Sequence, residues 1–246
     1  MYVQDQISQT YRQLPPLFYF PKSQLQCYGE SVYSTTSKSN LLSKCNNEES
    51  PLERLTSVVA WSISTTRPTS FGVAPYNPVL GETHHVSKGN LNVLLEQVSI
   101  NPPVSALHAT DKKENIEMIW CQQPAPKTVK VKDTSSGKVK VIYDAKEVIS
   151  GLKAPIVKDA EGVWQTESAL IWGELTEAII SNDWEKAKEA KQGVEERQRK
   201  MLIERETKGE HWTPKNFLVS YSNESGLECE CSPINKWVPP APITAL

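Results

Sequence analysis

The chain has 246 residues, 38% of them hydrophobic, and a formal net charge of −2 at pH 7. This length fits one large domain or two small ones, and the hydrophobic share is well above that of disordered chains. The near-neutral balance excludes a global attraction to nucleic acid or anionic membranes, so electrostatic binding would need a local patch.

The sequence also bears on the compartment. Its five cysteines form no C-x-x-C pair, and this usage is typical of a reducing compartment where cysteine is a small buried hydrophobe. They are Cys27, Cys45, Cys121, Cys229 and Cys231. The first residues lack the basic and apolar regions of a secretory signal, and no apolar run approaches the ~20 residues that span a bilayer. We therefore expect a cytosolic protein that attaches only peripherally to intracellular membranes.

The first part of the chain gives few signals of regular structure. Residues 1–50 are expected to be irregular, because prolines bracket a short apolar stretch and a Ser/Thr-rich run follows. The apolar run over 52–63 fits a helix or a strand equally well, since periodicity does not separate the two in short runs. Residues 51–145 are expected to hold the sheet.

Strand signals follow in close succession. Pro102 and Pro103 should end the first apolar strand, because proline cannot donate to a ladder. A charged turn at 111–114 should join the next two strands. A hairpin is predicted where valines alternate with lysines on both sides of Ser135-Ser136-Gly137. The predicted strands cover 91–98, 104–109 and 116–121, and the hairpin covers 127–143.

The last third of the chain is predicted to be helical and then extended. Residues 166–208 should form two helices: one from Thr166 to about residue 180, and one from Trp184 to about Lys208 that Asn182 or Asp183 caps. Gly209 is the expected stop of the second helix. The aromatic and proline-rich tail, 209–246, should form an extended strap. The predicted class is α+β, an antiparallel sheet followed by helices.

Two groups of side chains suggest chemistry, although a structural role explains each of them better. Glu82, His84 and His85 resemble metal ligands, but adjacent histidines on a strand point to opposite faces, so we expect a polar strand end. Cys121 and His108 could form a nucleophile and a base, but no third group is recognisable and a buried cysteine is favoured. We expect no enzyme, no metal site and no cofactor, because glycine-rich phosphate loops are also absent from the sequence.

Two basic groups could bind anions. The hairpin lysines 130, 132, 138 and 140 could face a membrane, each contributing ~1 kcal/mol, but the solvated outer face of a sheet is the favoured explanation. Lys191, Glu195 and Arg199 follow i, i+4, i+8 spacing, so they share one helical face. They could hold a phosphate, with Glu195 fixing the two cations, although spacing alone favours an ordinary surface pair.

Two ordered motifs carry a resemblance to a known family. The chain reads NPVLGE from Asn77 to Glu82 and EQVSINPP from Glu96 to Pro103. It resembles the oxysterol-binding-protein-related family, whose signature is EQVSHHPP preceded by NPxLGE. The segments KQGVEERQRK and WTPKNF are similar to the family's C-terminal region, and QLPPLF, KSQLQCYGES and KWVPPAP are similar to plant members.

The resemblance implies a fold, a ligand and a site. Family members form an incompletely closed antiparallel β-barrel around a lipid tunnel, and carry sterol or another lipid between membranes in exchange for phosphatidylinositol 4-phosphate. Lys191, Glu195 and Arg199 match the family's head-group helix, and Asn77 matches its NPxLGE asparagine. The expected partners are a sterol or other lipid, phosphatidylinositol 4-phosphate and, transiently, a membrane surface, but no nucleic acid.

Three positions depart from the family pattern. Ile100 and Asn101 replace the two signature histidines, and Ala74 stands where many members carry lysine. Isoleucine donates no hydrogen bond and asparagine carries no charge, so phosphate donors are lost or weakened. If each charged hydrogen bond contributes ~1.5–3 kcal/mol, head-group affinity should fall by orders of magnitude.

The chain also looks internally short. After Pro124-Ala125-Pro126 the family continues with further barrel strands, whereas here Lys127 leads into a segment similar to the far side of that block. The N-terminal lid looks shorter as well. We therefore expect a single truncated lipid-binding domain over 1–246, with an incomplete barrel followed by C-terminal helices. Two hypotheses stay open: a sterol or phospholipid carrier, and a transfer-deficient isoform that regulates membranes or partners.

Overall fold

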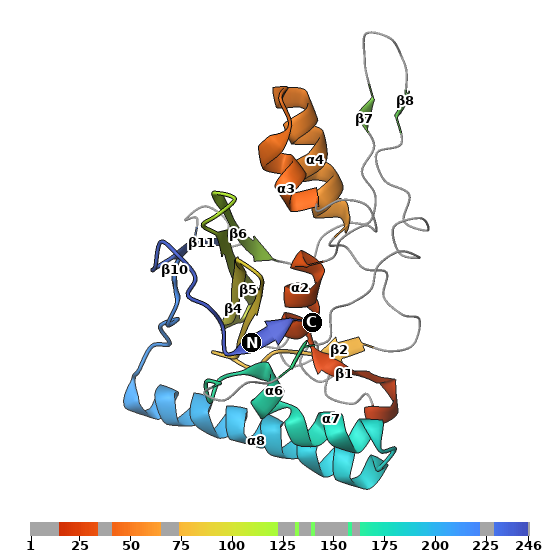
Figure 1. Ribbon diagram of the computed structural model, residues 1–246. Coiled ribbons are helices and arrows are strands. Elements are labelled where there is room, and N and C mark those ends of the chain that lie inside the picture. Colours follow the sequence, from red (N-terminus) through yellow and green to blue (C-terminus); the bar gives the residue numbers. More distant parts are fainter. Residues whose placement is uncertain are drawn as a thin grey trace.

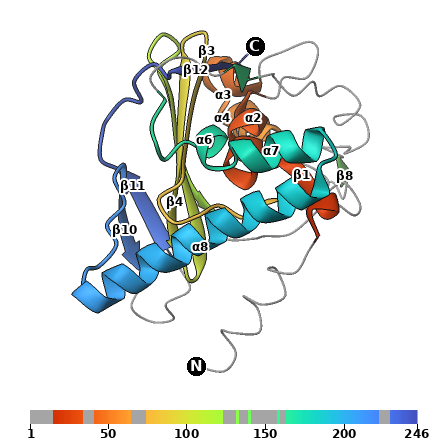
Figure 2. The same cartoon turned by 90° about the horizontal axis from the view of Figure 1, so that it is seen from below.

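The computed structural model describes residues 15–33, 41–64, 74–122, 131–132, 139–140, 157–158, 163–221 and 229–245. A twisted sheet stands at the centre, with helices on one side and a two-stranded hairpin on the other (Figures 1 and 2). A long helix, α8 (Trp184–Lys208), runs beneath them in Figure 1.

Most of the sheet is a four-stranded antiparallel meander. Its strands are β3 (Thr83–Lys88), β4 (Leu91–Ile100), β5 (Pro103–Asp111) and β6 (Ile116–Gln122). The predicted strands at 91–98, 104–109 and 116–121 are thus confirmed, each a little longer than expected. Gly89, with φ +61°, makes the β3–β4 turn, and Asp111 Oδ1 accepts the backbone N–H of Lys113 and Glu114 in the β5–β6 turn.

The C-terminal end of the chain completes the sheet. Strand β12 (Ile243–Ala245) pairs in parallel with β3, and β9 (Val157–Lys158) pairs with β12, giving the order β6-β5-β4-β3-β12-β9. In the described strands β6 and β9 are the two edges and do not pair, so the sheet remains open. The tail is therefore more than the predicted extended strap, because part of it is a sheet strand.

The two faces of the sheet are covered by different elements. Strand side chains alternate between faces, so Leu95 and Leu107 pack with Leu25 of α2 (Gln24–Val32) in one core. Val104 and Ala106 lie on the other face and pack with the hairpin β10 (Phe217–Tyr221) and β11 (Cys229–Pro233). Burial of both faces specifies the register of the meander.

The N-terminal region is more regular than the sequence predicted. It contains a 3₁₀ turn, η1 (Pro16–Phe18), β1 (Tyr19–Ser23), α2, and α3 (Leu41–Asn47). Helix α2 begins with a capping box: Ser23 Oγ accepts from Leu25 N, and Gln26 Oε1 accepts from Ser23 N. The expectation of an irregular region over 1–50 was wrong for these residues.

Residues 51–145 are also not all sheet. The ambiguous run at 52–63 is a helix, α4 (Pro51–Ser64), which packs with α3. Strand β2 (Ala74–Tyr76) pairs in parallel with β1, apart from the main sheet. Of the predicted hairpin, β7 (Val131–Lys132) and β8 (Val139–Lys140) are paired, and each of their lysines lies opposite a valine. Lys130, Lys138 and the other residues of the predicted hairpin lie outside the described residues.

The C-terminal helices follow the predicted signals closely. Trp172 divides the first predicted helix into α6 (Ser168–Ile171) and α7 (Gly173–Ile180). Asp183 caps α8 (Trp184–Lys208) by accepting from Lys186 N, and Gly209 ends it with φ +66°. A third core joins α7 and α8 to β1 and β2 through Tyr19, Tyr76 and Trp172. None of the helices in the described ranges is both long and apolar enough to cross a bilayer.

Gly29 in α2 provides a test of this packing. A Cβ atom there would lie 2.6 Å from Cδ2 of His84, a fully buried side chain. Gly29→Ala should lower the free energy of unfolding by about 1–3 kcal/mol, because overpacking outweighs the higher helix propensity of alanine. Urea denaturation measures this change. Gly173→Ala is the matched control, because nothing lies within 4 Å of its Cβ position; equal losses in both variants would contradict the packing.

Candidate functional site

The NPVLGE segment forms a tight turn that leads into β3. Gly81 adopts φ +78°, its N–H donates to Gln97 O at 2.9 Å, and Glu82 O accepts from Gln97 N at 2.9 Å, so the turn is fastened to β4. A Cβ atom on Gly81 would lie 2.5 Å from the Trp212 ring. Glycine is required here for its backbone conformation and for close contact with the WTPKNF segment.

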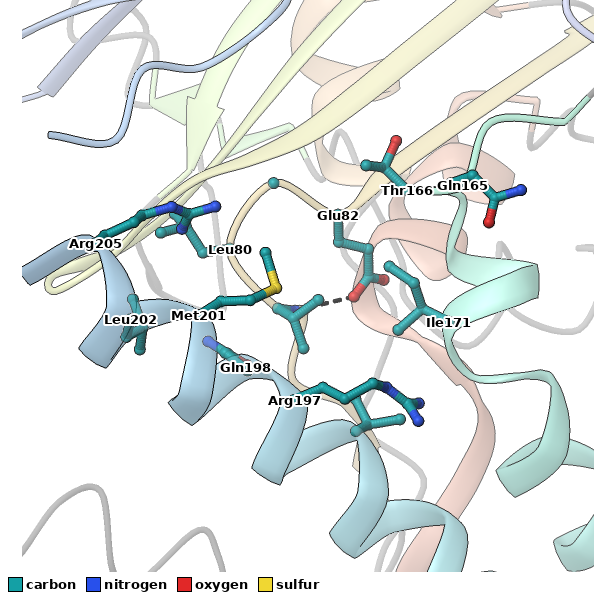
Figure 3. Close-up of a pocket in the computed structure, with 13 residues that line it drawn as sticks. Leu80, Glu82, Gln165, Thr166, Ile171, Arg197, Gln198, Met201, Leu202 and Arg205 are labelled. Carbon is teal, nitrogen blue, oxygen red and sulfur yellow. Dashed lines mark hydrogen bonds between the residues drawn. The ribbon is translucent and has the colours of Figure 1, made fainter. Parts of the chain in front are cut away.

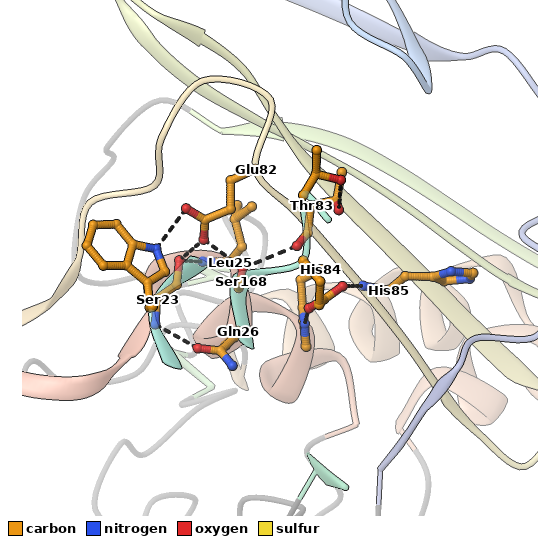
Figure 4. A network of polar contacts seen from close by, with 11 residues as sticks. Ser23, Leu25, Gln26, Glu82, Thr83, His84, His85 and Ser168 are labelled. Carbon is orange, nitrogen blue, oxygen red and sulfur yellow. Dashed lines mark hydrogen bonds and ion pairs between the residues drawn. The ribbon is translucent and has the colours of Figure 1, made fainter. Parts of the chain in front are cut away.

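A buried carboxylate, Glu82, lies at the centre of a polar network (Figure 4). It accepts hydrogen bonds from the hydroxyls of Ser23 and Ser168, from Trp172 Nε1 at 2.9 Å and from Val79 N at 2.9 Å. Burial raises its pKa above the usual carboxyl value, and the four hydrogen bonds act in the opposite direction. Glu82 directly precedes β3, as the expected polar strand end has it, but its carboxylate is completely buried.

The second signature glutamate, Glu96, is also fully buried. Its carboxylate accepts from Lys215 N at 2.8 Å, from Asn216 N at 2.9 Å and from Asn216 Nδ2 at 2.9 Å. The EQVS motif is therefore joined to WTPKNF by a carboxylate that satisfies three donors. Sequence reasoning missed this contact, because about 120 residues separate its partners.

His84 and His85 follow Glu82 on β3 but belong to a separate network. His84 Nδ1 lies 2.7 Å from Glu167 Oε1, and His85 N donates to Glu167 Oε2 at 3.1 Å. His85 Nε2 lies 2.9 Å from Pro239 O, and burial lowers its pKa below the usual histidine value. The structure thus ties these two side chains to Glu167 and to the tail rather than bringing them together with Glu82.

Cys121 and His108 do not form a nucleophile and base. His108 Nε2 lies 3.0 Å from Glu117 Oε1, and burial lowers the pKa of its imidazole. Cys121 instead accepts a hydrogen bond from Cys231 Sγ at 3.1 Å, which lowers the pKa of Cys121 to about 7. The two residues engage different partners on neighbouring strands.

One of the residues matched to the head-group helix, Lys191, lies beside a cluster of three aromatic rings. Lys191 Nζ lies 2.7 Å from Glu195 Oε1 and 5.6 Å from the Tyr19 ring centroid. The Tyr19 ring lies 5.8 Å from that of Tyr76, which stacks on Trp172 at 4.9 Å. The side chain of Lys191 is 12% exposed, so a cation stands at the edge of a largely apolar cluster.

The remaining predicted residues lie near this cluster or at the other end of β4. Asn77 is exposed and directly follows Tyr76, and Arg199 is exposed on α8, one turn beyond Glu195. Ala74 is paired with Tyr19 in the β1–β2 register. Ile100 is the last residue of β4 and is partly buried, and Asn101 begins the β4–β5 turn and is exposed.

A small cavity lies beside this cluster, between α8 and the NPVLGE turn. Its volume is about 200 Å³, below the ~300–1,000 Å³ of pockets that enclose a drug-sized ligand. Figure 3 shows Met201 and Arg205 of α8 facing the turn that carries Leu80 and Glu82. Arg197 also lines the cavity, so the guanidinium groups of Arg197 and Arg205 border its mostly apolar lining. The sequence did not single out these residues, because charged side chains occur on every face of α8.

Comparison with known proteins gives this geometry a context. The family model described as oxysterol-binding protein matches residues 10–149, more than half of the chain. The chain belongs to this family. It is 38% identical to oxysterol-binding protein-related protein 4B of Arabidopsis thaliana and 36% identical to protein 4A, covering 94% of this chain and 86% and 85% of those proteins.

The alignment with protein 4B runs over 333 positions, more than the 246 residues of this family member. Residues of the relative therefore lack counterparts within the matched region, which supports the expectation that the chain is internally short.

Solved structures agree on the fold. The chain resembles the ORD domain of Osh1 in complex with ergosterol, with a TM-score of 0.58 and 15% identity over 88% of this chain and 81% of that one. It also resembles the ORD of Osh3 from Saccharomyces cerevisiae in complex with PI(4)P, with a TM-score of 0.55 and 16% identity over 90% and 85%. The predicted class, an incomplete antiparallel barrel with C-terminal helices, is confirmed.

The Glu82 network predicts unequal effects of two substitutions. Glu82→Ala should cost about 3–5 kcal/mol of unfolding free energy, because several buried donors lose their acceptor. Glu82→Gln should cost about 1–3 kcal/mol, since the serine hydroxyls can accept from the new amide while Trp172 and Val79 still donate to its oxygen. Chemical denaturation followed by tryptophan fluorescence measures both losses. Glu174→Gln, on an exposed position of α7, is the control, and an equally large loss there would contradict the network.

Proposed function

We propose that this family member binds a lipid and carries it, as a non-vesicular transporter of sterols, between intracellular membranes. The observation that carries the proposal is the fold, which it shares with domains solved with ergosterol and with PI(4)P. A sterol is apolar with a single hydroxyl, so a dry interior with a few polar groups can take it from a bilayer. The protein would act from the cytosol, attach peripherally to membranes and catalyse no reaction.

The phosphoinositide head group is proposed to bind beside Tyr19. Lys191 supplies a point charge, and Glu195, 2.7 Å away, holds its position. The exposed Arg199 adds a planar fork that can engage a phosphate with two hydrogen bonds, and Asn77 adds a neutral amide. These groups come from α8 and from the end of β2, which the aromatic stack holds side by side.

This head-group site should be weaker than one that keeps the family signature. Ile100 offers no donor and Asn101 no charge, and Ala74 places a methyl group beside Tyr19 where many members carry lysine. The chain would therefore bind phosphatidylinositol 4-phosphate with reduced affinity, and exchange of sterol for this lipid would be inefficient.

A second candidate function is that of a transfer-deficient regulator that binds membranes or partners. The open sheet favours it: among the described strands β6 lies at an edge and carries an exposed Ile119, and such an edge can pair with another chain. The cavity of about 200 Å³ among the described residues points the same way, since a sterol would have to enlarge it.

Transfer and capture experiments separate the two functions. The carrier should move dehydroergosterol between liposomes and retain one lipid per chain in native mass spectrometry after membrane extraction. A regulator should associate with liposomes or with a partner yet carry no lipid. Failure to transfer, even after the missing strands are restored from a relative, would eliminate the carrier.

Binding to phosphoinositide liposomes should depend on the α8 cations. Lys191→Ala with Arg199→Ala should weaken binding to vesicles that contain phosphatidylinositol 4-phosphate by at least about tenfold, since each charged hydrogen bond contributes ~1.5–3 kcal/mol. Flotation or surface plasmon resonance measures the change. Lys188→Ala with Lys200→Ala removes the same charge from exposed positions of the same helix. Similar losses in both pairs would indicate non-specific attraction and remove Lys191 and Arg199 from the site.

Restoring the signature histidines should strengthen the same interaction. Ile100→His with Asn101→His should increase affinity for these vesicles by about tenfold or more, with a larger gain at pH 6 than at pH 8 because the imidazolium is the better phosphate partner. Repeating the change in the Lys191→Ala, Arg199→Ala background tests whether the two ends act on one phosphate. Equal gains in both backgrounds would place the histidines outside the shared site.

A further inference from the structure

Three of the five cysteines converge at one edge of the sheet. Cys121 lies on β6, while Cys229 and Cys231 lie on β11, and the two strands contact each other at the left of Figure 1. The Sγ atoms of Cys121 and Cys231 are 3.1 Å apart, those of Cys229 and Cys231 are 4.0 Å apart, and all three lie within 4.8 Å of one another.

The fold explains this convergence. Alternation along a strand puts residues i and i+2 on the same face, so the Cys-Glu-Cys sequence of β11 presents both thiols together. Phe217, Val98 and Val104 pack in the same core and hold the β10–β11 hairpin against β6. Cys231 is buried and the other two thiols are partly exposed, so the cluster is rigid at its base and open to solvent at its rim.

The spacing suits a thiolate-bound metal ion. Zn–S bonds of ~2.3 Å in a tetrahedral site imply sulfur–sulfur distances of about 3.8 Å, within the range spanned by the three thiols. Thiolates select soft d¹⁰ cations such as Zn²⁺ and Cu⁺, and carboxylate or carbonyl sites do not. In the described residues the group contains these three ligands, which leaves a fourth position for water.

We propose that Cys121, Cys229 and Cys231 form a three-thiolate site for a soft d¹⁰ metal ion, with Zn²⁺ as its first occupant. Binding replaces three S–H protons, which pass to solvent, by three metal–sulfur bonds and involves no change of oxidation state. The ion joins the C-terminal hairpin to the edge strand of the sheet, two segments far apart in sequence, and stabilises the folded chain by binding it in preference to the unfolded one.

The same thiols could instead form a disulfide between Cys121 and Cys231. That step removes two hydrogen atoms and two electrons, so it requires an external oxidant. It would consume two ligands and abolish metal binding, which makes the two chemistries distinguishable.

The test uses the reduced, metal-free full chain. Added Zn²⁺ should bind one per chain in native mass spectrometry, raise Tm by several degrees, and lower the number of thiols that react with Ellman's reagent by three. Co²⁺ should give a thiolate-to-metal charge-transfer band, and Cu⁺, offered against a chromophoric chelator, shows which d¹⁰ ion is preferred.

Variants assign the ligands. Cys229→Ser should abolish the Co²⁺ band and the change in thiol count, whereas the matched double variant Cys27→Ser with Cys45→Ser should retain both. If a Cys229→Ser chain fails to fold, the Cys27→Ser, Cys45→Ser chain still decides, because its three remaining thiols must all become protected. A thiol count that Zn²⁺ leaves unchanged would overturn the proposal. So would a chain whose mass is two hydrogens lower than that of the dithiol form and which binds no Zn²⁺, because that chain holds a disulfide.

Discussion

The buried carboxylate of Glu82 is the contact on which the helical layer depends. It accepts hydrogen bonds from Ser23 at the β1–α2 junction, from Val79 of its own turn, from Ser168 at the start of α6 and from Trp172 at the α6–α7 junction, so three segments meet at two oxygens. Burying a carboxylate is costly, and the cost is offset only while these donors stay in place. Trp172 in turn stacks on Tyr76, and through this stack the carboxylate positions Lys191 beside Tyr19.

A second buried carboxylate repeats the arrangement on the other side of the sheet. Glu96 receives the backbone of Lys215 and Asn216, while Trp212 covers Gly81. The NPVLGE and EQVS motifs and the WTPKNF segment thus form one contact region between the sheet and the C-terminal segments. The glutamates of the two motifs serve the scaffold, whereas Asn101, at the end of the second motif, is exposed.

Local signals predicted the elements that local physics decides. Alternation and turn residues gave β4, β5 and β6, and Asp183 and Gly209 gave the two ends of α8. Residues 24–32 were missed because the prolines before them outweighed the capping box at Ser23. The partners of Glu82 and Glu96, the pairing of β12 with β3 and the meeting of Cys121 with Cys231 depend on contacts between distant segments, for which the sequence contains no local pattern.

The proposed head-group residues were assigned by resemblance, and the structure shows which of the signature positions can change without disturbing the fold. Asn101 is exposed in a turn and Ile100 is only partly buried, so replacing histidine there leaves no buried group unsatisfied. Glu82 and Glu96 are fully buried among fixed donors, where an apolar side chain would leave several of them unpaired. Constraints from folding and from the proposed ligand binding would therefore act on different positions of the same motifs. A chain can keep every residue of the scaffold, and with it the family's fold, while its affinity for an anionic head group changes through residues the scaffold does not use.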